Sequence, residues 1–304
     1  MERIVSLLPS TTEIACALGF GPQLVGRSHE CDFPPEIRDL PVLTRPKLDA
    51  RAGSREIDDR VKSLVRDGLS VYEVDADGLR ELAPTHILTQ DQCEVCAASL
   101  GDLESALAIW TGERPKVVSL SPQTLGDVWR SIIEVAVALS AGERGSELTN
   151  SLADRLTEIA ERTPSQSRRP RVACIEWLDP LMAAGNWIPE LVTLAGGQNL
   201  LGRAGSHSPW LTVAELTDAD PDVIVVLPCG FDLGRTREEL MRVIERPPWP
   251  QLRAVEQGRV FLTDGNQFFN RPGPRLVESL AIFSEIFHPK TIEPVHRGTG
   301  WSAL

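Results

Sequence analysis

Four cysteines stand at positions where sulfur could bind a metal. Cys93 and Cys96 are separated by two residues in the run TQDQCEVC, and this spacing lets both sulfurs reach one soft metal ion. Cys31 and Cys229 each follow a predicted strand, as the Cys93–Cys96 pair does. The carboxyl ends of parallel strands gather at the ligand-binding edge of a sheet. One interpretation is a site for zinc, iron or an iron–sulfur cluster. The other is that Cys93 and Cys96 are ordinary loop residues or form an adventitious disulfide.

Histidine and carboxylate side chains accompany these cysteines. His29 and Glu30 immediately precede Cys31, and His207 lies in a loop that contains glycine and serine. Imidazole can bind a metal directly or only form a hydrogen bond, and both possibilities stay open for the two histidines. An enzyme that uses His29, Glu30 and Glu176 for general acid–base catalysis is a third possibility, because such groups must lie within hydrogen-bonding reach of a substrate.

The elements that must position these residues alternate between short apolar strands and amphipathic helices. In the first part of the chain we predict strands at Ile4–Leu8, Leu24–Gly26, Val71–Val74, His86–Leu88 and Val117–Leu120. Helices are predicted at Thr11–Leu18, capped by Ser10 or Thr11, and at Glu56–Asp67, Asp77–Leu82 and Leu103–Trp110. Residues 33–54 contain four prolines and are predicted to form a long loop. Strand followed by helix, repeated, is typical of a parallel sheet in an α/β domain.

A change of pattern separates two such regions. Residues 125–162 contain no proline and carry apolar residues at helical spacing, which predicts two helices, the second from about Glu143 to about Glu161. A second α/β pattern follows, with strands at Val172–Ile175, Val223–Leu227 and Val260–Leu262, and helices near Ile188–Ala195, Val213–Leu216, Glu238–Glu245 and Arg275–Ile286. We therefore predict an N-terminal lobe over residues 1–142, a linking helix over 143–165 and a C-terminal lobe over 166–304. The stretch from Pro289 onward shows no periodicity and is expected to be an appendage.

Composition argues against several classes of partner. The chain of 304 residues is 42% hydrophobic and 24% charged, as is usual for globular proteins. Its formal net charge of −12 argues against nucleic acid or an anionic membrane as a main partner, because both require basic surfaces. No run of about 18 apolar residues could span a membrane, and no basic, apolar leader precedes the first strand. We therefore expect a cytoplasmic protein, unless a leader was removed.

The ordered set of segments resembles a known family. The opening RIVSLLPSTTEIACALG, the segment CDFPPEIRDLPVL and the long joining helix are similar to the cobalamin-binding branch of ABC-transporter substrate-binding proteins. This helical-backbone class also includes iron–siderophore-binding proteins. In the second lobe the resemblance continues through LMAAGNWIPELVTLAGGQNLL, SPWLTVAELTDADPDVIVV and FFNRPGPR, and it covers most of the chain. It implies an α/β fold of two Rossmann-like lobes with mainly parallel sheets, joined by one long backbone helix.

The resemblance also implies where a ligand binds. In this family the ligand lies in the cleft between the lobes, against loops at the carboxyl ends of both sheets. Carried over to this sequence, and completed with neighbouring polar and aromatic side chains, the expected ligand-binding residues are Pro9, Ser10, His29, Glu30, Glu176, Trp177, Trp187, His207, Trp210, Phe268, Phe269 and Asn270. Aromatic faces with a few polar groups suit a large, flat, partly apolar ligand such as a corrin.

We therefore predict a non-catalytic protein that binds a corrinoid such as cobalamin, or another metal chelate, and does not insert into a membrane. The resemblance implies an ABC permease as partner, and Asp77 and Glu215 are the nearest candidates for the acidic residues with which the family docks. In the cytoplasm the protein would instead sequester, deliver or sense its ligand. The alternative is a cytosolic metal or metal-cluster protein that uses the four cysteines Cys31, Cys93, Cys96 and Cys229.

Overall fold

The computed structural model describes residues 2–66, 71–91, 103, 107, 110, 113–163 and 168–304. The chain divides into two compact units. The first comprises residues 1–52, 56–122 and 126–151, and the second comprises residues 53–55, 123–125 and 152–304. The long helix α6 (Gly142–Arg162), which the sequence predicts almost to its ends, contributes residues to both units.

The first unit contains a fully parallel sheet of four strands. Its order is β2-β1-β5-β6, with β1 at Ile4–Ser6, β2 at Leu24–Arg27, β5 at His86–Gln90 and β6 at Lys116–Leu120. β1 pairs with both β2 and β5 and is therefore a central strand. The side chains of Ile4, Val5 and Ile87 have no exposed surface, as expected for a parallel sheet that is covered on both faces.

Helices of the first unit bury their apolar residues against this sheet. Helix α1 (Pro9–Ala17) contacts β1 and β5, and α3 (Ala76–Leu82) contacts β2. Helix α5 (Leu125–Ala138) follows β6, and three of its apolar residues, Val128, Ile132 and Val135, are completely buried. The described part of this unit also contains α2 (Ser54–Arg66), whose first two residues are assigned to the second unit, and two short 3-10 helices, Gly21–Gln23 and Pro35–Asp39.

Helix α1 begins earlier than the sequence predicts. Its first residue is Pro9, and its N-cap residue, Leu8, makes no side-chain capping bond. Proline favours the first helical position because its φ is already set for a helix and it has no N–H that needs a partner. The predicted cap by Ser10 or Thr11 is therefore wrong, and Thr11 Oγ1 instead donates a hydrogen bond to the carbonyl of Leu8 at 3.0 Å.

Two strands of the first unit lie outside the parallel sheet. β3 (Thr44–Pro46) and β4 (Tyr72–Val74) form a separate antiparallel pair, in which Thr44 lies opposite Val74. The prediction that residues 71–74 join the parallel sheet is therefore wrong, and residues 33–54 are not entirely loop. Proline obscured β3, although the edge of a small sheet tolerates it because an edge strand does not need every N–H.

The second unit is built on a mixed sheet of six strands. Its order is β12-β11-β10-β7-β8, and β9 also pairs with β7. Three parallel strands form the centre, β7 (Arg171–Leu178), β10 (Val223–Val226) and β11 (Val260–Thr263). Three short strands that the sequence does not reveal join them, namely β8 (Leu181–Ala183), β9 (Gln198–Asn199) and β12 (Trp301–Ala303).

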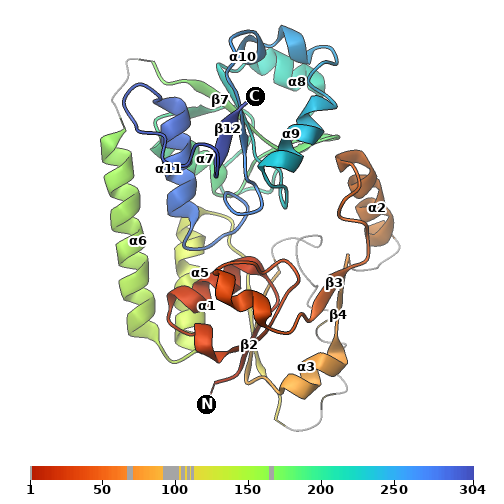
Figure 1. Ribbon diagram of the computed structural model, residues 1–304. Helices are drawn as coiled ribbons and strands as arrows, with labels where there is room; N and C mark the ends of the chain where they lie inside the picture. Colours follow the sequence, from red (N-terminus) through yellow and green to blue (C-terminus); the bar gives the residue numbers. More distant parts are fainter. Residues whose placement is uncertain are drawn as a thin grey trace. The chain divides into compact units, whose positions relative to one another are not determined.

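Helices cover both faces of this second sheet. Figure 1 shows α8 (Val213–Ala219), α9 (Leu233–Met241) and α10 (Arg253–Glu256) on one side of it, and α7 (Ile188–Leu194) with α11 (Leu276–Phe287) on the other. A short 3-10 helix, Trp249–Gln251, lies beside α10. Leu216, Leu240 and Trp249 pack with the central strands in one buried cluster. The predicted α/β architecture with mainly parallel sheets is confirmed.

The C-terminal segment is part of the fold, and its prediction as an appendage is wrong. β12 pairs antiparallel with β11, and the indole of Trp301 is 4% exposed. Its Nε1 donates a hydrogen bond to Glu285 Oε2 at 2.6 Å, and His296 Nδ1 lies 2.6 Å from Oε1 of the same carboxylate. A strand of three residues has no detectable periodicity, because its position is set by the partner strand and by α11.

Candidate functional site

Hydroxyl groups cluster at the carboxyl end of β1, where α1 begins. Ser6 Oγ lies 2.7 Å from Thr11 Oγ1, and Thr12 Oγ1 donates a hydrogen bond to Ser6 Oγ at 2.8 Å. Ser10 is 2% exposed and Pro9 is also buried, yet Ser10 Oγ has no partner among the residues that the structure describes. A buried hydroxyl without a partner costs about 1–3 kcal/mol, which makes Ser10 a candidate for a hydrogen bond to a ligand.

Cys31 lies beneath this cluster rather than on an open edge. Its side chain is 1% exposed, and Thr12 Oγ1 donates a hydrogen bond to its Sγ at 3.0 Å. The chain turns inward directly after β2, where the N–H of Ser28 donates to the carbonyl of Ser6 at 2.9 Å. This turn carries the Cys31 side chain into the interior, and its predicted role as a metal ligand stays a prediction.

The predicted metal site is only partly described. Cys93 and Cys96 lie outside the described residues, and Cys229 is exposed after β10 in the second unit. Within the described ranges, no group of three or more histidine, cysteine, aspartate or glutamate side chains is placed to hold a metal ion. The alternative of zinc, iron or an iron–sulfur cluster therefore stays a prediction.

Five side chains form a polar cluster after β2, named here the His29 cluster: Ser28, His29, Glu30, Thr44 and Tyr72. His29 Nδ1 lies 2.7 Å from Thr44 Oγ1, which donates a hydrogen bond to Ser28 Oγ at 3.1 Å. The hydroxyl of Tyr72 donates to Glu30 Oε1 at 3.1 Å, and the rings of Tyr72 and His29 are 5.4 Å apart between centroids. The His29 cluster thus combines side chains that follow β2 with side chains from the small β3–β4 sheet.

The environment of His29 favours the neutral ring. Burial, and secondly the positive charge of Arg27, lower the pKa of His29 below its ordinary value of 6.5, because a buried site disfavours the charged imidazolium. The guanidinium of Arg27 is fixed nearby, since it donates to the carbonyls of Ser28 at 3.1 Å and Cys31 at 3.0 Å. The cluster therefore presents a neutral imidazole at pH 7.

Polar groups also meet near the carboxyl end of β7 in the second unit. Ser208 Oγ donates a hydrogen bond to Glu176 Oε2 at 2.8 Å and accepts one from the N–H of Gly185 at 3.0 Å. Residue 185 must be glycine, because a Cβ there would lie 2.4 Å from the carbonyl oxygen of Ser206. The close approach of these two backbone segments holds the Glu176 carboxylate in place.

Two predicted ligand-binding residues of the same loop are exposed. His207 Nδ1 lies 2.9 Å from the carbonyl oxygen of Ser208. Trp210 is 52% exposed, although its backbone is fixed by an antiparallel bridge to Met182. An indole that is held on ordered backbone and still faces solvent is a candidate contact for a ligand.

Two other predicted residues belong to the interior of the second unit. Phe269 has no exposed surface, and its ring lies edge-on to Phe283 with the centroids 4.9 Å apart. Trp187 is 4% exposed, and its Nε1 donates a hydrogen bond to the carbonyl of Phe269 at 2.7 Å. Each ring fills the core beside α11 and α7, and their predicted contact with a ligand stays a prediction.

The loop after β11 is held by its own side chains. Asn270 Nδ2 donates to the carbonyls of Leu227 at 2.9 Å and Gly265 at 3.0 Å, and Phe268, 8% exposed, lies against the guanidinium of Arg275. Burial raises the pKa of Asp264, which begins this loop, although hydrogen bonds from Gln267 and Asn266 oppose the change. Phe268 and Asn270 thus have structural partners, and their contact with a ligand stays a prediction.

Trp177 joins residues 53–55 to the second unit. Its Nε1 donates a hydrogen bond to the carbonyl of Ser54 at 3.2 Å, and its ring lies 5.1 Å from that of Phe231. The N–H of Ser54 in turn donates to Glu239 Oε2 at 2.9 Å. The indole N–H of Trp177 therefore has a protein partner, and a ligand contact would use its ring.

The two acidic candidates for permease docking make local contacts. Glu215 forms a capping box with Thr212 at the start of α8, and these hydrogen bonds lower its pKa. Asp77 is paired with Arg80 on α3. Their role in docking stays a prediction.

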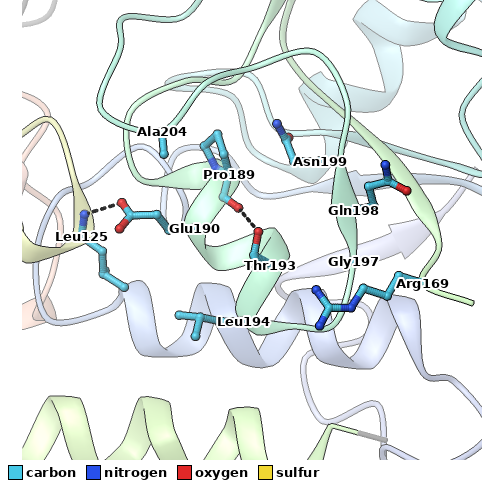
Figure 2. A pocket seen from close by; sticks show the side chains of 10 residues that line it. All are labelled: Leu125, Arg169, Pro189, Glu190, Thr193, Leu194, Gly197, Gln198, Asn199 and Ala204. Carbon is cyan, nitrogen blue, oxygen red and sulfur yellow. Dashed lines mark hydrogen bonds between the residues drawn. The ribbon is translucent and has the colours of Figure 1, made fainter. Parts of the chain in front are cut away.

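A hollow of about 680 Å³ lies elsewhere on the second unit (Figure 2). Glu190 Oε2 accepts a hydrogen bond from the N–H of Leu125 at 2.8 Å on one side of it, and Arg169 and Gln198 lie on the other. None of the predicted ligand-binding residues lines this hollow.

Thr44, Tyr72 and Ser208 are among the residues of these sites that escaped prediction. Thr44 and Tyr72 belong to strands of the small sheet, and Ser208 follows His207 in its loop. Tyr72 is the only tyrosine of the chain, and this rarity was the one feature of the sequence that singled it out. Nothing in the local sequence indicates that it meets His29, because that contact depends on the pairing of β3 with β4.

Among the helices that the structure describes, none is both long and apolar enough to cross a membrane. The predicted cytoplasmic location stays a prediction.

Comparisons with known proteins agree with this fold. The chain is 22% identical to an uncharacterized ABC transporter substrate-binding lipoprotein of Bacillus subtilis, over 96% of this chain and 82% of that protein. It is 23% identical to a vitamin B12-binding protein of Photorhabdus laumondii, over 90% of this chain and 84% of that protein. A solved periplasmic heme-binding protein from Roseiflexus sp. RS-1 matches with a TM-score of 0.70 and 23% identity, over 95% of this chain and 98% of that chain.

These likenesses assign the two-lobed class III periplasmic-binding-protein fold. The family model described as periplasmic binding protein matches residues 4–266, which include β1 of the first unit and β7, β10 and β11 of the second. Proteins of this family bind a solute and have no catalytic step, which confirms the predicted absence of enzyme activity. The chain therefore belongs to the periplasmic binding protein family, the substrate-binding proteins of ABC transporters.

Proposed function

We propose that the ligand of this substrate-binding protein is a corrinoid of the cobalamin type. The similarity to a vitamin B12-binding protein over 90% of the chain supports this ligand. The structural likeness to a heme-binding protein makes heme the competing ligand. Both are large, flat metal chelates with apolar faces and polar edges, so the same kind of surface serves either.

The observation that carries the proposal is the exposed indole of Trp210. More than half of its surface, 52%, is open although the backbone is bridged to Met182. An aromatic face supplies a large contact area at low entropic cost. Nearby, the carboxylate of Glu176 is oriented by Ser208 and could accept hydrogen bonds from amide groups at the edge of a corrin.

The first unit offers polar groups of the same kind. Ser10 Oγ lacks a partner within the described part of the chain, and Glu30 is held by the hydroxyl of Tyr72. Because an unpartnered buried hydroxyl gains a full hydrogen bond when a ligand arrives, Ser10 favours ligands that carry amide or carboxylate groups. We infer that Ser10 and Glu30 are the polar contacts that this unit offers to a corrinoid, and that Glu176 and Trp210 are those of the second unit.

Titration calorimetry with cyanocobalamin, cobinamide and hemin tests the ligand. We expect the corrinoids to bind at micromolar concentration or tighter, and Trp210→Ala to weaken them about 10- to 100-fold, the usual effect of removing a central aromatic contact. Val213→Ala is the matched control, since it also truncates an exposed apolar side chain, 40% exposed, near Trp210 in the chain. Binding of hemin without binding of either corrinoid would overturn the ligand assignment. Equal losses in the two variants would overturn the contact assigned to Trp210.

A further inference from the structure

The hydrogen bonds around Thr44 determine which nitrogen of His29 carries the proton. Thr44 Oγ1 has a single hydrogen and donates it to Ser28 Oγ at 3.1 Å. The same oxygen accepts the backbone N–H of His29 at 3.1 Å and lies 2.7 Å from Nδ1. Because its hydrogen is already used, this oxygen can only accept from Nδ1. Nδ1 therefore carries the proton, and the neutral ring presents the lone pair of Nε2.

The position of the ring is fixed on its Nδ1 side. Thr44 belongs to β3, and the ring of Tyr72, from the paired strand β4, lies 5.4 Å away between centroids. In contrast, Nε2 has no hydrogen-bond partner within the described ranges of the chain, and the side chain is only partly buried. Metal-binding histidines are held in this way, with one ring nitrogen donating to an oxygen so that the other faces the metal.

We propose that Nε2 of His29 binds the cobalt of the corrinoid ligand. The inference rests on the proposed function and names the residue that contacts the metal. Binding is a ligand substitution in which the Nε2 lone pair forms a bond to cobalt and the water in that axial position leaves. No electron is transferred, and the proton stays on Nδ1, where Thr44 accepts its hydrogen bond. His29 would therefore bind a corrinoid with an exchangeable axial water and gain nothing from one whose axial positions are both firmly occupied.

His207 is the competing imidazole. Its Nδ1 lies 2.9 Å from the carbonyl oxygen of Ser208, which can only accept, so the neutral ring of His207 also carries its proton on Nδ1. It differs from His29 in position, because it lies exposed in a loop, whereas the oxygen that accepts from His29 Nδ1 belongs to the strand β3. A direct test must therefore distinguish the two histidines.

Electron paramagnetic resonance of cobalt(II) cobinamide, reduced before it is mixed with the protein, supplies this test. Cobinamide lacks the internal nucleotide base, so any axial nitrogen must come from the protein. We expect the bound cobalt signal to show triplet splitting from one nitrogen, and doublet splitting when the protein contains 15N-labelled histidine. His29→Gln should abolish the splitting, because the glutamine amide can still bond to Thr44 but offers no comparable nitrogen lone pair.

Matched variants keep the result interpretable. His207→Gln should retain the splitting, and thermal unfolding of both variants establishes that each is folded. Thr44→Val removes the oxygen that orients His29 and should weaken cobinamide binding about 10- to 100-fold, while cyanocobalamin binding changes little. Cobinamide bound to the unaltered protein without nitrogen splitting would overturn the inference and leave the proposed function standing. Splitting lost in His207→Gln and kept in His29→Gln would also overturn it, and failure of every corrinoid to bind would overturn both proposals.

Discussion

The substitution Glu285→Leu tests whether one buried carboxylate anchors the C-terminal segment, residues 289–304. Glu285 lies on α11, is 2% exposed, and accepts hydrogen bonds from Trp301 Nε1 at 2.6 Å and from the N–H of His296 at 3.1 Å, with His296 Nδ1 at 2.6 Å. Leucine fills a similar space but accepts no hydrogen bond. The indole N–H of Trp301, which is itself 4% exposed, then loses its partner.

The size of the effect follows from these contacts. A buried donor without an acceptor costs about 1–3 kcal/mol, and the bonds to a charged oxygen lie in the upper part of that range. The ring of His296 is partly exposed and can turn to water, so Trp301 dominates. The leucine variant also avoids the free-energy cost of burying a charged carboxylate, and this gain offsets part of the loss. We expect about 2–3 kcal/mol to be lost from the docking of residues 289–304, which raises the undocked population about 30- to 150-fold.

Limited proteolysis with trypsin measures this population. The bond after Arg297 lies between His296 and β12 and is cut when the segment is undocked. When redocking is faster than cleavage, the cutting rate follows the undocked population. Glu285→Gln is the control, and it should accelerate cleavage less than about fivefold. Its amide oxygen still accepts from Trp301, and its amide nitrogen can donate to His296 Nδ1. A leucine variant cut after Arg297 no faster than the unaltered protein would refute the anchoring role, as would equal acceleration at sites throughout the second unit.

Two further predictions concern titration. Burial acts to raise the pKa of Asp222, but the N–H of Arg171 and nearby guanidinium groups such as that of Arg168 prevail and lower it. Its charge therefore stabilises the fold above the ordinary pKa of about 4, and this contribution is lost as the pH falls through the lower folded value. Asp222→Asn should lower the thermal midpoint at pH 7 by about 2–4 °C, which corresponds to about 1 kcal/mol, and a difference of the same size at pH 3 would contradict this. Burial, with nearby carboxylates, raises the pKa of Cys16 to about 11. Maleimide should therefore label Cys16 more slowly at pH 8 than the exposed Cys229, and the labelling rate of Cys16 should increase about tenfold per pH unit. Equal labelling rates of the two cysteines, measured in their mapped peptides, would contradict this prediction.

Central strands and the long helix were predictable from local patterns. β10 and the middle of β7 read as continuous apolar runs because parallel central strands are covered on both faces. Helix α6 was visible through its helical spacing and the absence of proline. Short edge strands such as β8 and β12 were not, since their conformation is imposed by the strand beside them.

In the candidate sites, too, some features were predictable from the sequence and others were not. The position of His29 after β2 was readable, because a polar run directly follows an apolar strand. Its neighbours Thr44 and Tyr72 were not, since they reach the ring through the pairing of β3 with β4. Cys31, two residues from His29, also follows the strand but turns inward toward Thr12. Residue type and spacing thus located the edge of the sheet, and backbone direction decided which side chains remain accessible there.

By itself the sequence determined the α/β alternation, the long helix α6 and the resemblance to substrate-binding proteins, because these depend on local periodicity and on ordered segments. Only the tertiary structure decided the roles of the aromatic residues. Trp187 and Trp210 both have polar residues within two positions before them in the sequence, yet the first donates to the carbonyl of Phe269 inside the core and the second faces solvent. Trp301 at the end of the chain is buried against Glu285. Exposure of a side chain is set by whatever packs around it, and in each case those neighbours come from distant parts of the chain.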